Sequence, residues 1–270
     1  MHVLDRNIND LELRIKDIYN YNPREENTSL QTSLSAYGWI LLDAWVAWRS
    51  LRFLLKDTYI DDNVLDKWFQ TPSSYTAAQI KAVWKFDDSA EKYIEDRTNK
   101  GLKSLFDGTI QANRNAAAHF TKKVEIKGSD RQNIKQFFEA LSTVFLFYET
   151  KAFFVRVTEK LSKNGFESFK INFIENDIEF NMEDIASSIK VYDKCEKFLI
   201  IGQKISGEII CIYVEEEGCF VSHNRKIEKN SMNPVIDSEH SKYYFWGNKG
   251  FYRDVDMFVN SVISCLNTNQ

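Results

Sequence analysis

Residues 130–165 read DRQNIKQFFEALSTVFLFYETKAFFVRVTEKLSKNG, a strongly apolar stretch that ends in a turn signal. Large apolar side chains recur every three or four residues, which is the spacing of one buried face of an α-helix. They are Ile134, Phe137, Phe138, Leu141, Val144, Phe145, Tyr148, Phe153 and Val157. Asn164 and Gly165 form a good C-terminal stop. We therefore predict one long helix from about residue 131 to residue 162.

The same helical period is found on the N-terminal side of this stretch. The predicted helices there cover residues 7–20, 29–56, 76–97 and 102–120. Trp39, Trp45 and Trp48 lie at helical spacing among leucines and isoleucines in the second of them. Such a pattern favours a packed core over a surface on which nucleic-acid bases stack. The sequence thus predicts an all-α helical bundle for residues 1–164.

After Gly165 the apolar period shortens to two residues, which is typical of strands. The predicted strands cover residues 169–173, 178–180, 198–201, 208–214, 219–223 and 243–246, with short helices at 182–192 and 255–266. The acidic segment 215–218 predicts a hairpin between two of these strands. The expected fold class is α+β, with a helical domain over 1–164 and a small α+β domain of unassigned role over 165–270.

Composition excludes several classes of protein. The 10 glycines and 3 prolines are few for 270 residues, which favours long regular elements. The start of the chain lacks the apolar run of a signal peptide, and Asp43, Arg49 and Arg52 interrupt the apolar stretch 37–55, which makes it a poor membrane span. The four cysteines form no C-x-x-C pair and indicate reduced thiols. We expect a cytoplasmic protein that uses no membrane, metal or cofactor.

One short segment carries the credible catalytic chemistry, because residues 114–119 read Arg-Asn-Ala-Ala-Ala-His. Asn115 lies four residues before His119, so the two share a helix face, and its amide can orient the imidazole. The three alanines keep the helix intact and leave room beside it. The other histidines, His2, His223 and His240, are better interpreted as surface residues, and no phosphate-binding glycine loop, G-x-S-x-G or H-E-x-x-H motif occurs.

An Arg-Asn-x-x-x-His motif on an internal helix resembles the signature of the HEPN superfamily, an arginine, a polar residue and then a histidine four to six residues after the arginine. The following apolar helix also fits a HEPN bundle. The resemblance covers the motif and the helical layout of about residues 1–160. Many HEPN proteins are ribonucleases of toxin–antitoxin, phage-defence or RNA-processing systems, and others are binding modules. It implies Arg114 and His119 as catalytic residues, with Asn115 in support.

The chemistry agrees with this implication. Cleavage of RNA by its own 2′-hydroxyl needs a base, an acid and positive charge at the phosphorus. Histidine can serve as base or acid near neutral pH, and arginine holds phosphate oxygens in pairs. On a straight helix Arg114 and His119 are about 140° apart, since each residue turns the helix by roughly 100°. Either the arginine wraps around the helix or a second subunit completes the site, so we predict a homodimer.

The charge of the chain is unevenly distributed along the sequence. The net charge of −4 argues against a general nucleic-acid coat protein, yet residues 92–135 hold 10 basic against 5 acidic side chains. Lys122 and Lys123 in this stretch are predicted to bind RNA, although a solvated charged face explains them equally well. We expect a toxin or anti-phage effector with an antitoxin or defence-system partner.

The alternative is a non-catalytic HEPN-type adaptor that binds a partner protein or a nucleotide. Buried, hydrogen-bonded Arg114 and His119 would favour the adaptor. Both side chains in an open basic cleft would favour the nuclease.

Overall fold

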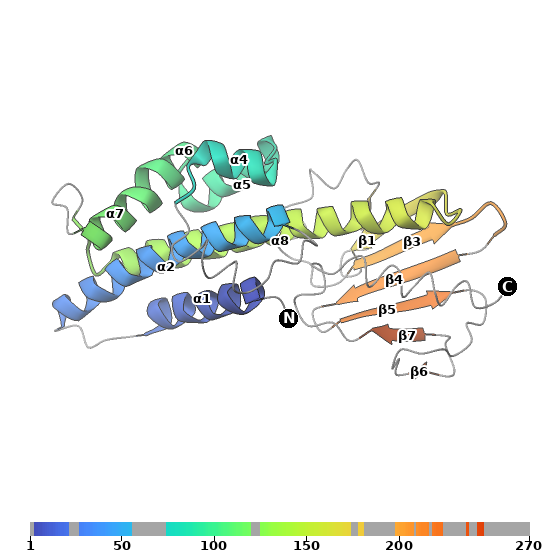
Figure 1. Ribbon diagram of the computed structural model, residues 1–270, viewed down its shortest axis with the longest axis horizontal. Coiled ribbons are helices and arrows are strands. Elements are labelled where there is room, and N and C mark those ends of the chain that lie inside the picture. The colour runs from blue at the N-terminus through green and yellow to red at the C-terminus, as the bar shows by residue number, and fades with distance from the viewer. Residues whose placement is uncertain are drawn as a thin grey trace. The chain divides into compact units, whose positions relative to one another are not determined.

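The computed structural model describes residues 3–21, 27–55, 74–119, 125–173, 178–180, 198–207, 209–215, 218–223, 236–237 and 242–245 (Figure 1). The chain divides into two compact units, residues 1–146 and 147–270. The division falls inside the long helix α8 (Asp130–Ser162), whereas the backbone changes from helix to strand between Ser162 and Ser168.

The first unit is helical. Its elements are α1 (Val3–Asn20), α2 (Thr28–Leu55), α4 (Ala77–Trp84), α5 (Asp88–Thr98), α6 (Leu102–Leu105), the π-helical turn η1 (Phe106–Ile110), α7 (Gln111–His119) and the first part of α8. Helix α1 packs along α2, and α2 also contacts α4, η1 and α7. The helices predicted over 7–20, 29–56, 102–120 and 131–162 are confirmed to within a few residues at each end.

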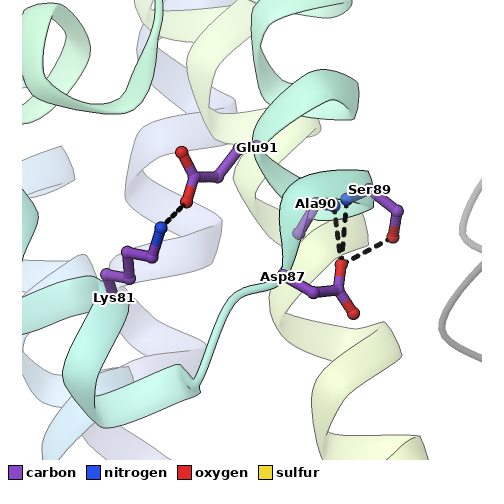
Figure 2. Close-up of polar contacts among 5 residues, drawn as sticks. All are labelled: Lys81, Asp87, Ser89, Ala90 and Glu91. Carbon is purple, nitrogen blue, oxygen red and sulfur yellow. Dashed lines mark hydrogen bonds and ion pairs between the residues drawn. The ribbon is translucent and has the colours of Figure 1, made fainter.

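The single helix expected over residues 76–97 is wrong, because the chain breaks there into α4 and α5 (Figure 2). Lys85 adopts a left-handed conformation with φ of 54°, which ends α4. The carboxylate of Asp87 then accepts the backbone amides two and three residues ahead at 3.0 and 3.1 Å, and so caps α5. An ion pair between Lys81 and Glu91 links the two helices across the break.

Aromatic side chains form much of the core of this unit. Trp39 and Trp45 are almost fully buried, which confirms their assignment to the core, whereas Trp48 is only partly buried. The ring centroid of Trp39 lies 5.8 Å from that of Phe137, and Trp45 lies 4.8 Å from Phe138. These contacts join α2 to the first half of α8.

Trp84 at the end of α4 extends the same aromatic core. Its ring is stacked between Phe53 at 4.2 Å and Phe145 at 4.3 Å. The indole Nε1 donates a hydrogen bond of 2.9 Å to the buried hydroxyl of Ser50. Offset stacking of this kind adds to the free energy gained by burying the rings themselves.

The three charged residues that interrupt the apolar stretch of α2, namely Asp43, Arg49 and Arg52, are all buried. A buried charge is stable only when it is paired. The Nη1 atom of Arg49 lies 3.1 Å from the carboxylate of Glu12 on α1, and Trp45 donates to that same carboxylate at 3.0 Å. No helix in the described part of the chain is both long enough and apolar enough to cross a bilayer.

The segment from Leu102 to His119 is one continuous helix whose middle turn is π-helical. Gly108 lies in this widened turn. The Asp107 carboxylate accepts the backbone amide of Ala77 at 2.8 Å, which fixes the turn to the start of α4. Single π turns inside α-helices occur frequently at functional sites.

The second unit contains an antiparallel sheet in the order β2-β1-β3-β4-β5-β7-β6. The strands are β1 (Ser168–Phe173), β2 (Ile178–Phe180), β3 (Phe198–Gln203), β4 (Ile209–Glu215), β5 (Gly218–His223), β6 (Ile236–Asp237) and β7 (Lys242–Phe245). The predicted hairpin is confirmed, with Glu215 opposite Gly218. Alternate residues Ile210 and Ile212 are fully buried. The described chain is therefore mainly helical with an antiparallel sheet, and the helices expected at 182–192 and 255–266 lie outside the described residues.

Candidate active site

Arg114 lies on α7 with its side chain turned toward α2. Its Nη1 donates a 2.9 Å hydrogen bond to the amide oxygen of the neighbouring Asn115. Its Nε lies 3.5 Å from the carboxylate oxygen Oδ2 of Asp43, and 27% of the side chain remains exposed. Nη1 is therefore hydrogen-bonded and Nε is ion-paired, and among the described residues Nη2 forms neither kind of contact.

Asp43 supplies the negative charge on the α2 side of this cluster. Only 7% of its side chain is exposed. The hydroxyl of Ser74, just before α4, donates a 2.6 Å hydrogen bond to Oδ2, the oxygen that also faces Arg114. Burial raises the pKa of the Asp43 carboxyl above its ordinary value, while the Ser74 hydrogen bond and the charge of Arg114 act in the opposite direction. The three elements α2, α7 and the start of α4 meet at this one carboxylate.

His119 is the last residue of α7 and is exposed. The described residues give it no hydrogen-bond partner. Asn115, which the sequence suggested as a support for the imidazole, directs its amide oxygen to Arg114 instead. Because α7 is a regular α-helix, Arg114 and His119 keep their separation of about 140° around the helix axis.

The structure thus joins Arg114 and Asn115 by a hydrogen bond, and within the described residues neither of them is hydrogen-bonded to His119. Lys122 and Lys123 lie outside the described residues, between α7 and the segment that leads to α8. His223 ends β5 in the second unit. Within the described ranges, no group of three or more His, Cys, Asp or Glu side chains could hold a metal ion.

Sequence reasoning missed Asp43 and Ser74 as neighbours of the motif. The signal for Asp43 was present, since it is an acid between the buried residues Leu42 and Trp45 on a predicted core helix. An acid at such a position needs a partner from another element. The sequence does not say which cation supplies the charge, and Ser74 carried no signal of its own.

The chemistry open to this arrangement follows from its groups. An anchored guanidinium is permanently charged and can hold a phosphate oxygen. An exposed imidazole can take up or release a proton near neutral pH. Each of these groups suits a reaction at a phosphate ester, and no described contact joins the two. Comparison with known proteins adds no relative, since no family model, curated protein or solved structure matches this chain.

Proposed function

We propose that this chain is a metal-independent endoribonuclease of the HEPN type, acting in the cytoplasm as a toxin or anti-phage effector. The observation that carries the proposal is that Arg114 is both held in place and accessible. Its side chain is anchored through Nε and Nη1, yet 27% of it remains exposed on the helix that ends in the exposed His119. A pre-oriented, accessible cation is what a developing phosphorane needs.

In this proposal the 2′-hydroxyl of the RNA attacks the adjacent phosphorus. His119 takes the proton from that hydroxyl, and Arg114 binds the non-bridging oxygens as charge builds on them. The bond to the 5′-oxygen of the next nucleotide breaks, and a second proton donor neutralises that leaving oxygen. The products are a 2′,3′-cyclic phosphate and a 5′-hydroxyl.

The second candidate function is the non-catalytic adaptor. The ion pair between Arg114 and Asp43 favours it, because Arg114 neutralises a buried carboxylate and therefore has a structural task of its own. In that case Arg114 would be needed for stability alone, and His119 would be an ordinary surface residue.

The test is cleavage of a single-stranded RNA by purified protein in the presence of EDTA, with wild type, His119→Ala and His223→Ala compared. The proposal expects wild type and His223→Ala to leave 2′,3′-cyclic phosphate ends, and His119→Ala to be slower by about 10²–10⁴-fold. Because His119 is exposed, the thermal unfolding of His119→Ala should match that of wild type. Activity abolished by chelation, or full activity in His119→Ala, would refute the mechanism.

A further inference from the structure

The carboxylate of Asp43 has no evident benefit for stability. It is buried in α2, and among the described residues its partners are the partly exposed Arg114 and the Ser74 hydroxyl. Burying an ion pair generally costs as much in lost hydration as the pair returns, and an apolar replacement is often neutral or stabilising. The raised pKa of Asp43 reflects the same cost. A role other than holding the bundle together is therefore indicated.

The contacts of Arg114 bear on this role. A guanidinium is a planar fork, so fixing two of its nitrogens fixes the direction of the third. The amide oxygen of Asn115 accepts a hydrogen bond from Nη1 on the same helix, while the Asp43 carboxylate on α2 forms an ion pair with Nε at 3.5 Å. Nη2 then points in a set direction with no described residue to receive it. Ser74 in turn limits the movement of the Asp43 carboxylate.

We propose that Asp43 is the positioning residue of the active site, which holds the Arg114 guanidinium so that its Nη2 edge meets the phosphate of the substrate, with Ser74 fixing the carboxylate. Asp43 touches no substrate itself. This inference rests on the proposed function, because it assigns Asp43 a task in phosphate binding at that same site.

Asp43→Asn is the informative change, since it keeps the shape of the side chain and removes its charge. The control is Glu12→Gln, which makes the same change in the carboxylate–arginine pair formed with Arg49. We expect Asp43→Asn to lower kcat for RNA about 10- to 100-fold with little change in KM, because misplacement of a catalytic group by about 1 Å has effects of that size. Glu12→Gln should keep wild-type kcat.

Two further measurements separate positioning from a merely structural effect. In an Arg114→Ala background, Asp43→Asn should cause no additional loss of kcat, since there is no guanidinium left to orient. In ¹⁵N-labelled protein, the Nε–Hε resonance of Arg114, identified by its absence from Arg114→Ala, should shift on titration with inorganic phosphate. That shift should need higher phosphate in Asp43→Asn and be unchanged in Glu12→Gln.

The outcomes decide each claim separately. If wild type cleaves RNA and Asp43→Asn cleaves equally well, the inference is overturned and the proposed function stands. If wild type does not cleave RNA but phosphate shifts the Arg114 resonance in an Asp43-dependent way, the nuclease proposal fails and the positioning role is upheld. No phosphate response in wild type overturns the inference. Should Asp43→Asn fail to fold, Ser74→Ala replaces it, with an expected loss in kcat of about 2- to 10-fold. Wild-type kcat in Ser74→Ala would then overturn the inference.

Discussion

The Nε atom of Arg114 and the Oδ2 atom of Asp43 lie 3.5 Å apart, in a pair whose acid is buried and whose base is partly exposed. The pair connects α7 to α2 and brings the candidate motif into contact with the core of the first unit. Because the two partners differ in burial, removing one has a different consequence from removing the other.

Removal of Arg114 should destabilise the fold more than removal of the Asp43 charge does. Arg114→Ala leaves the Asp43 carboxylate buried with only the Ser74 hydroxyl as a described partner, and should lower the free energy of unfolding by about 1–3 kcal/mol. Adding Asp43→Asn removes the unpaired charge and should recover most of that loss. Urea unfolding of the two single variants and the double variant measures this. Losses that simply add would contradict the coupling.

The free energy of unfolding should depend on pH through the titration of Asp43. Folding raises the pKa of this carboxyl above its ordinary value of 3.8, so the folded state binds its proton more tightly than the unfolded state does. The resulting stabilisation is complete below the unfolded pKa and is lost as the pH rises through the raised folded pKa. The free energy of unfolding of wild type should therefore fall relative to Asp43→Asn as the pH increases from about 3.8. Denaturant titrations of both proteins between acidic and neutral pH check this, and a free energy of unfolding of wild type that rises relative to Asp43→Asn as the pH increases would contradict it.

Ser50 should matter to stability through a single hydrogen bond. Ser50→Ala leaves the buried Nε1–H of Trp84 without its acceptor, at a cost of about 1–3 kcal/mol. In a Trp84→Phe background there is no such donor, and the same serine change should cost much less. Thermal and urea unfolding of the four proteins give the coupling. An equal cost in both backgrounds would show that the hydrogen bond contributes nothing.

A homodimer is expected to complete the active site. Each chain offers one motif histidine, and a two-fold axis would bring a second His119 and a second Arg114 to the same cleft. A tagged heterodimer of wild type with Arg114→Ala/His119→Ala should then have well under half the activity of the wild-type dimer, whereas two independent sites would give roughly half. An active enzyme that is monomeric in solution by light scattering would exclude the idea.

The helices of the first unit were largely predictable because their apolar period is long and unbroken. The break between α4 and α5 was missed, since its left-handed residue is Lys85 rather than glycine or asparagine, the usual residues at that position. Asp87 caps α5 two residues after this break. Strand β6 has only two residues and presents no alternation to recognise.

Only those residues of the candidate site that lie close together in the sequence could be predicted. Arg114, Asn115 and His119 stand close in the sequence, so their spacing is visible in it. Asp43 and Ser74 come from elements far earlier in the chain, and tertiary packing alone brings them to Arg114. The partner of Asn115 was equally beyond reach, because the choice between Arg114 and His119 depends on which way a single amide turns.

The π-helical turn η1 has a consequence for how such a site could arise. A π turn holds one residue more than the α turn it replaces, so every side chain after it is rotated by about 100° from its place on an uninterrupted α-helix. Residues of α6 contact α4 and α5, while α7 contacts α2. A single inserted amino acid thus rotates the side chains of α7 about the helix axis relative to those of α6, within one continuous helix. Gain or loss of that residue would change which side chain of α7 is presented to Asp43 while leaving both helices, and the loops around them, otherwise as they are.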